Sequence, residues 1–145
     1  MAVRNVVRLG EEEAPAIPGA DRLHHLPPLR SYWHEDALID FAISKGIVIL
    51  SYAPLAKGAA NGLLNDPAIL AVAAAHGVTP AQAALKWNLQ RTQQGVVLPR
   101  STNSSHMAEN LAVASMAWSL TAAEMASLAG LPQKKLYGTS CYPYC

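Results

Sequence analysis

Two short apolar runs organise the pattern of the chain, and each is closed by a proline. Residues 47–53 read IVILSYA and stop at Pro54, and residues 96–98 read VVL and stop at Pro99. Continuous apolar runs of this length are typical of strands that are buried on both faces, as in a parallel sheet. The pattern therefore predicts two buried parallel strands.

Helix start and end signals surround these two strands. Acidic residues open the segment before the first strand, and Gly46 closes it. Asp66-Pro67 and Thr79-Pro80 each place an N-cap before a proline that suits the first helical turn, and residues 121–124 (TAAE) have the spacing of a capping box. The predicted helices are residues 35–45, 67–76, 81–91, 105–114 and 122–130.

Strands joined through helices form right-handed βαβ units, which need a parallel sheet. The chain offers only two clear strands, or three if residues 3–9 form a short one. A complete parallel α/β domain has a wider sheet, because its strands must be covered on both faces. We therefore expect an incomplete sheet that is part of something larger.

The composition narrows the class of protein. Of 145 residues, 51% are hydrophobic and 14% are charged, and the formal net charge is +1. This balance argues against a nucleic-acid surface, and no apolar run has the length of a membrane span or the core of a signal peptide. Cys141 and Cys145 lie near the C-terminus, which argues against a disulfide framework. We expect a cytoplasmic globular chain that binds neither nucleic acid nor membrane.

The first thirty residues differ from the rest because they show no sustained helical or strand period. Residues 1–30 are therefore predicted to be loop-rich or disordered. His24, His25 and His34 lack a recognisable ligand spacing, which favours a solvated loop over a metal site. No metal is expected.

The turn after the second strand has the residues of an anion site. Arg100 offers a planar guanidinium that suits phosphate, the next three residues offer neutral donors, and a helix is expected to start at Ser104 or Ser105. Free amides and the positive end of the helix dipole would then face one point. The alternative is an ordinary strand–helix loop with Arg100 in solvent.

Residues 33–131 resemble the C-terminal part of the aldo-keto reductases, NADP-dependent oxidoreductases built on a (β/α)8 barrel. The likeness rests on three ordered blocks. Residues 51–55 (SYAPL) are similar to the family's A-Y-S-P-L, and residues 80–87 (PAQAALKW) to its T-P-A-Q-(V/A)-x-L-x-W helix. Residues 98–111, with LPRS and ENL, are similar to its I-P-K-S-…-R-x-x-E-N.

The resemblance implies a fold, a partial TIM (β/α)8 barrel. Residues 47–53 would be barrel strand 7 and residues 96–98 strand 8, and the loops after these two strands often build a phosphate site. Residues 1–30 would lie outside the barrel, residues 31–131 would form its C-terminal part, and residues 132–145 would be a tail.

The resemblance also implies the cofactor NADP(H) and a set of contacts. In the family a Lys-Ser pair and a later Arg grip the 2′-phosphate, and here Arg100, Ser101 and His106 hold these positions. A largely neutral histidine weakens that grip. Tyr52 matches the aromatic residue that stacks on the nicotinamide, although a core tyrosine is the alternative. The expected cofactor-binding residues are Tyr52, Pro54, Leu55, Arg100, Ser101, Thr102, Asn103, His106, Glu109 and Asn110, the last two matching contacts to the adenine amino group.

No catalytic residue is assigned to this chain, because the family's Tyr, Lys, Asp and His tetrad comes from the first half of the barrel. Tyr32, His34 and Asp36 lie at a helix entrance and would face the outside or bottom of a barrel. Two functions stay open. One is NADPH-dependent reduction of a small aldehyde or ketone, once a catalytic half completes the barrel. The other is a non-catalytic nucleotide-binding or structural remnant, and in either case exposed strand edges would favour self-association.

Overall fold

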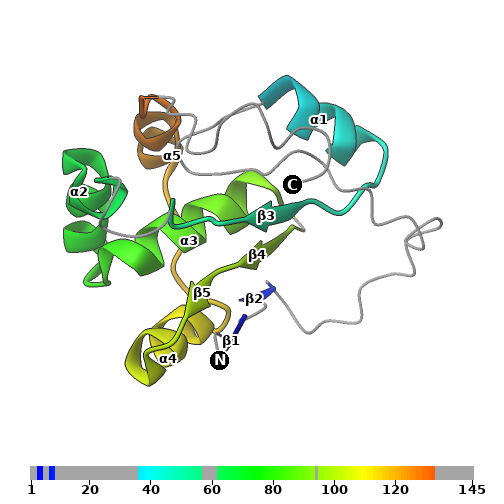
Figure 1. Cartoon of the computed structure of the whole chain (residues 1–145). Coiled ribbons are helices and arrows are strands. Elements are labelled where there is room, and N and C mark those ends of the chain that lie inside the picture. Colours follow the sequence, from blue (N-terminus) through cyan, green and yellow to red (C-terminus); the bar gives the residue numbers. More distant parts are fainter. Residues whose placement is uncertain (1–2, 5–6, 9–35, 57–61, 94, 133–145) are drawn as a thin grey trace.

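Short strands alternate with helices along the chain (Figure 1). The computed structural model describes residues 3–4, 7–8, 36–56, 62–93 and 95–132. The predicted helices are confirmed, with ends close to the expected residues. In order, the elements are β1 (Val3–Arg4), β2 (Val7–Arg8), α1 (Asp36–Ser44), β3 (Leu50–Tyr52), the 3₁₀ helix η2 (Leu63–Asn65), α2 (Pro67–His76), α3 (Pro80–Arg91), β4 (Val96–Leu98), β5 (Arg100–Ser101), α4 (Ser104–Ala112) and α5 (Ala122–Ala129).

The helix caps follow the sequence signals. The side chain of Asp66 accepts a hydrogen bond from the amide of Ala68 at 2.9 Å, and Pro67 fills the first position of α2. Gly77 ends α2 with φ 62°, a left-handed conformation that glycine adopts without steric cost. The capping box of Thr121 with Glu124 is confirmed at the start of α5.

The parallel pairing of the two apolar strands is also confirmed. β3 and β4 lie side by side, with Tyr52 opposite Leu98 at their C-terminal ends. Because both strands run in the same direction, the turns that follow them leave from the same edge of the sheet.

β3 is shorter than the predicted strand of residues 47–53, which was wrong at both ends. The amide of Ile47 donates to the carbonyl oxygen of Ala42 at 2.9 Å and so closes the end of α1 instead of joining a ladder. At the other end, Ala53 has φ 49°, outside the extended region. Both departures depend on hydrogen bonds and backbone angles that the apolar run does not encode.

The prediction that both faces of the strands are buried is corrected as well. Ser51 is fully buried, whereas the next residue, Tyr52, is 44% exposed. Since successive side chains of a strand point to opposite faces, one face of β3 is packed and the other is open in the described part of the chain. The packed face meets α3, where the Ser51 hydroxyl donates to Oδ1 of Asn88 at 3.1 Å.

The sheet is mixed rather than purely parallel. β2 pairs with β4 in antiparallel fashion, and the strand order of the larger sheet is β2-β4-β3. β1 pairs with β5, also antiparallel. The short N-terminal strand expected over residues 3–9 is thus present as two pieces, while most of the predicted loop of residues 1–30 lies outside the described residues.

Helix α3 forms the centre of the core, because every residue from 82 to 89 is buried. Trp87 packs with α2 and α5 residues such as Ile69 and Leu128. Leu85 on another face packs with Val97 of β4. Burying an aliphatic or aromatic side chain of this kind contributes about 1.5–3 kcal/mol to the free energy of unfolding.

Polar side chains of α3 also hold the chain that follows β4. They are spaced four residues apart and therefore lie along one face of the helix. Lys86 is buried, and this burial lowers the pKa of its ammonium group. Each of these side chains donates to a backbone carbonyl: Gln82 to Glu109 at 3.1 Å, Lys86 to Met116 at 2.9 Å and Gln90 to Leu120 at 2.8 Å.

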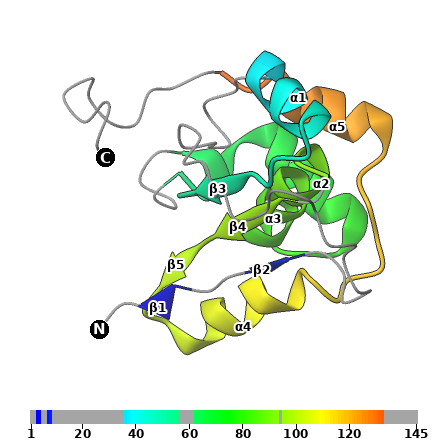
Figure 2. The ribbon, with the colours of Figure 1, turned by 90° about the vertical axis from the view of Figure 1, so that its right-hand side faces the viewer.

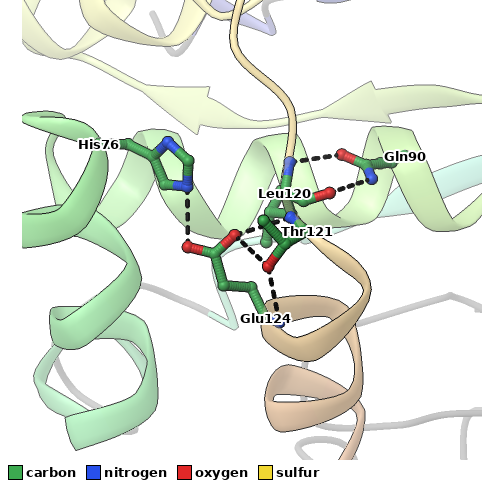
Figure 3. Close-up of polar contacts among 5 residues, drawn as sticks. All are labelled: His76, Gln90, Leu120, Thr121 and Glu124. Carbon is green, nitrogen blue, oxygen red and sulfur yellow. Dashed lines mark hydrogen bonds and ion pairs between the residues drawn. The ribbon is translucent and has the colours of Figure 1, made fainter.

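A side-chain contact joins the last residue of α2 to the first turn of α5 (Figure 3). Nε2 of His76 lies 2.8 Å from Oε1 of Glu124, and these side chains are 19% and 20% exposed. The imidazole also stacks on the ring of Trp118, with centroids 4.4 Å apart. The last residue of α2 is thus tied both to α5 and to the segment that precedes α5.

Among the described residues, none of the helices is by itself long and apolar enough to cross a membrane. Helices α2 and α3 together have the length and the apolar composition of a membrane span, but the chain bends by 93° between them.

Candidate functional site

The candidate site lies where β3 and β4 end. Their parallel register brings Tyr52 of β3 beside Leu98 of β4. The turn of residues 53–56 follows one strand, and the turn that leads through β5 into α4 follows the other. In (β/α)8 barrels, functional groups are carried by the loops at this end of the strands.

The turn after β4 presents an arginine to solvent. Pro99 is buried and Arg100 is exposed. Arg100 makes no ion pair with any other residue in the described ranges, so its guanidinium is available for an anion. Ser101 shapes the turn, because its Oγ accepts a hydrogen bond from the amide of Asn103 at 3.1 Å.

The start of α4 is capped by its own chain. Oδ1 of Asn103 accepts from the amide of Ser105 at 2.9 Å, and the carbonyl oxygen of Asn103 accepts from the amide of Met107 at 3.0 Å. The expectation of several free amides at this helix start therefore needs correction, because two of its first amides are already bonded: that of Asn103 to Oγ of Ser101 and that of Ser105 to Oδ1 of Asn103. The charge of Arg100 carries correspondingly more of any attraction for an anion.

The first turns of α4 differ in exposure from residue to residue. His106 is exposed and Glu109 is half-buried, while Asn110 is only 2% exposed. Ser105 donates its hydroxyl to Oε1 of Glu109 at 3.4 Å. Of the two positions that match adenine contacts, Glu109 can meet a ligand directly, whereas Asn110 lies beneath the surface.

The turn after β3 combines an exposed ring with buried supports. Tyr52 is 44% exposed, so its ring is not part of the core that the described residues form. Pro54 is buried, and Leu55 packs partly buried against two core clusters. Ala53 and Ala56 have φ 49° and 51°, a region that costs a residue with a Cβ roughly 1–2 kcal/mol. Such strain is found where a fixed backbone shape serves a site.

Gln82 is a residue of this site that the sequence analysis missed. Its Oε1 accepts from the amide of Thr79 at 3.0 Å and completes a capping box for α3, while its Nε2 donates to the carbonyl oxygen of Glu109. The box has the Thr-x-x-Gln signature and was readable from the sequence. The bond to α4 was not, because it joins residues far apart in the chain.

Of the other residues considered for chemistry, the structure describes Asp36. Asp36 lies 3.0 Å from Arg91 and forms an ion pair between α1 and α3. In the described ranges, no three acidic, histidine or cysteine side chains lie close enough to hold a metal ion. Tyr32, His24, His25, His34 and both cysteines lie outside the described residues.

Two parallel strands joined through helices, with turns that leave from the same edge of the sheet, are the repeating unit of α/β folds. The chain belongs to the aldo/keto reductase family, whose family model matches residues 24–132. It is 35% identical over 118 residues to the aldo/keto reductase slr0942 of Synechocystis sp., covering 75% of this chain and 35% of that protein. It is 39% identical over 98 residues to the methylglyoxal reductase DkgB of Yersinia pestis, covering 68% of this chain and 34% of that protein. The chain thus spans about a third of the length of these curated relatives.

Solved structures lead to the same fold. The crystal structure of Gox0644 without ligand matches with a TM-score of 0.66 and 32% identity, over 77% of this chain and 38% of that one. A mutant of Gox0644 in complex with NADPH matches with a TM-score of 0.60 and 34% identity, over 70% and 35% of the two chains. The fold is therefore a partial TIM barrel with an incomplete sheet, as the resemblance implied.

Proposed function

We propose that this chain is the cofactor-binding C-terminal part of an oxidoreductase that reduces aldehydes or ketones to alcohols with NADPH. One observation carries the proposal: the parallel pairing of β3 with β4 puts the exposed ring of Tyr52 and the turn of Arg100 at one edge of the sheet. The names of similar proteins, a methylglyoxal reductase and the aldehyde reductase YPR1 of Saccharomyces cerevisiae, support the substrate class. The NADPH complex of Gox0644 supports the cofactor.

The proposed cofactor-binding residues fall into two groups, according to whether they are exposed or buried. The exposed or half-buried residues would contact it directly, with Arg100 on the 2′-phosphate, Tyr52 against the nicotinamide and Glu109 at the adenine. The more buried members of the set, Pro54 and Asn110, would hold the binding surface from beneath. Ser101, Thr102, Asn103, His106 and Leu55 complete the proposed site.

The preference for NADPH would rest mainly on Arg100. Arginine offers a planar fork that can bond a phosphate through two nitrogen atoms. His106 is exposed and carries a full positive charge only when protonated, so it adds less than an arginine would. When bound, the cofactor supplies a hydride to the carbonyl carbon of the substrate.

A second candidate function is a nucleotide-binding or structural half-barrel without catalysis. No catalytic residue is assigned among the described residues, so a measurement of turnover decides between the two functions. We propose residues 31–131 as the barrel part in either case. β3 lies at the end of the larger sheet in the described part of the chain, and self-association would use that edge.

Fluorescence titration of the purified, size-checked chain with NADPH and with NADH tests the proposal. A charge-assisted hydrogen bond is worth about 1.5–3 kcal/mol, so Arg100→Ala should weaken NADPH by roughly tenfold or more and leave NADH almost unchanged. Lys45→Ala, which removes an exposed cation outside the site, is the matched control. Equal losses for both cofactors, or no binding by the parent chain, would contradict the proposal. Oxidation of NADPH with an aromatic aldehyde separates the enzyme from the non-catalytic remnant.

A further inference from the structure

The N-terminal segment takes part in the sheet although it lies outside the family match. The match covers residues 24–132, yet Val7 lies opposite Val97 and Arg8 opposite Val96 in the pairing of β2 with β4. The same segment continues the contact through β1, which pairs with β5. Figure 2 shows these two short strands along the side of β4 and β5 that faces away from β3.

This position matters because of the geometry of a closed barrel. Each strand of a (β/α)8 barrel has a parallel neighbour on both sides. Here β4 has a parallel neighbour, β3, on one side and the antiparallel β2 on the other. The chain's own N-terminal segment therefore occupies, in the opposite direction, the edge through which the sheet would otherwise continue to the next barrel strand.

We propose that β2, continued by β1 along β5, is an intramolecular cap on the outer edge of β4, and that this edge is a strand-binding site that accepts one strand at a time. An unpaired edge offers its amides and carbonyls to any strand of another chain, and covering it prevents this. The cap excludes both a second copy of this chain and a strand from a complementing half-barrel from the edge of β4, and it must be released before either can pair there.

The cap has the advantage of being in the same chain. Pairing between two segments of one chain depends on an effective concentration, which for linked binding modules is on the order of 1 mM. A second chain at about 10 μM would then need a strand that binds roughly a hundredfold more tightly to displace it. The inference concerns the edge of β4 alone and does not depend on the proposed cofactor.

The directions of the backbone amides in β4 and β2 predict which amides the cap protects. The amide of Val96 donates to the carbonyl oxygen of Ile49 at 2.8 Å, on the β3 side. Since successive amides of a strand point to opposite sides, the amide of Val97 points to the β2 side. Val7, directly opposite, then points its amide back to β4, whereas the amide of Arg8 points away.

The rate of amide hydrogen exchange at Val97 in the full chain shows whether the cap is in place. In an antiparallel pair such as Val7 and Val97, the amide of Val97 donates to the carbonyl oxygen of Val7, and the amide of Val7 donates back to the carbonyl oxygen of Val97. Proline has no amide and removes the second of these bonds, so Val7→Pro should weaken the pairing, speed exchange at Val97 by about tenfold or more and leave Val96 protected. Arg8→Pro, the matched control, should change Val97 little. A synthetic peptide of residues 1–10 should restore the protection of Val97 in the Val7→Pro chain, and the same peptide with Val7→Pro should not.

The proposal is overturned by either of two results. One is exchange at Val97 in the parent chain as fast as in an unfolded peptide, a result that needs no variant to fold. The other is equal protection of Val97 in the parent and the Val7→Pro chain.

Discussion

The side-chain amide of Gln90 holds both backbone groups of Leu120: its nitrogen donates to the carbonyl oxygen at 2.8 Å, and its oxygen accepts from the backbone amide at 2.9 Å (Figure 3). Leu120 itself is buried against the core. A single side chain of α3 thus replaces the hydrogen bonds that a strand or helix would give to this part of the α4–α5 connection.

Replacing Gln90 by glutamate should be costly. The variant Gln90→Glu keeps nearly the same side-chain shape, but its ionised carboxylate cannot donate to the Leu120 carbonyl, so a part-buried acceptor loses its partner. We expect a loss of about 1–3 kcal/mol in the free energy of unfolding, measured in urea. Gln93→Glu, the same change at an exposed glutamine, should stay within about 0.5 kcal/mol of the parent. Similar losses in both variants would show that the added charge, not the lost bond, is responsible.

Glu124 should make the stability depend on acid pH. The amide of Thr121 donates to its carboxylate at 2.7 Å, the Thr121 hydroxyl adds a bond at 2.9 Å, and His76 lies at 2.8 Å. These contacts hold the pKa of Glu124 below its ordinary value, the Thr121 amide most of all.

Because this pKa is lower in the folded chain than in the unfolded one, where it is about 4.3, the carboxylate contributes stability that is present above the unfolded value. That contribution is lost as the pH falls through the folded value. Urea unfolding from about pH 7 to about pH 3 should show a shallower loss of stability on the acid side for Glu124→Gln than for the parent. Parallel curves would contradict the role of Glu124.

Gly95 should tolerate no side chain. A Cβ at this position would lie 2.1 Å from Oγ1 and 2.5 Å from Cβ of Thr92, and 3.0 Å from the carbonyl oxygen of Ile49. Overpacking of this kind costs about 1–3 kcal/mol, so Gly95→Ala should lower the unfolding midpoint in urea. Gly130→Ala, whose nearest contact would be 3.3 Å from Ser127, is the control and should have a smaller effect. A Gly95→Ala chain as stable as the parent would mean that Thr92 can move aside.

Restoring the family's second cation should tighten NADPH, if the proposed site is correct. His106 is exposed, so an added charge–phosphate contact is worth about 0.2–1 kcal/mol, and His106→Arg should improve NADPH affinity by about 1.4- to 5-fold at low salt. The gain should shrink as salt is added. Ala108→Arg puts the same charge on the same helix away from the proposed contact. Equal gains in the two variants would indicate general attraction rather than a specific role of position 106.

The parts of the fold that depend on local signals were predictable from the sequence. Asp66 and Thr121 cap their helices through bonds to residues two and three positions away, and such spacings are visible in the chain. The parallel pairing of β3 with β4 follows from two apolar runs joined through helices. The length of β3 was not predictable, because it depends on the amide of Ile47 closing α1.

The distant contacts were equally hidden. Lys86 reads as an ordinary helix lysine, yet it is buried and bonded thirty positions further along the chain. The free amides expected at the start of α4 were only partly correct, since the side chains of Ser101 and Asn103 already accept from the amides of Asn103 and Ser105. Local charge and capping signals thus led to the proposed site, whereas the long-range hydrogen bonds around it could be seen only in the structure.

The two bonds of Gln82 have a practical consequence for protein engineering. One side chain completes the first turn of α3 and also holds the backbone of Glu109 in α4. A chimaera that combines α4 of this chain with an α3 from another protein keeps this brace only where that α3 has a glutamine at the position of Gln82 and places it at the same distance from the α4 backbone. Segments grafted from this chain should therefore run without interruption from Thr79 to the end of α4.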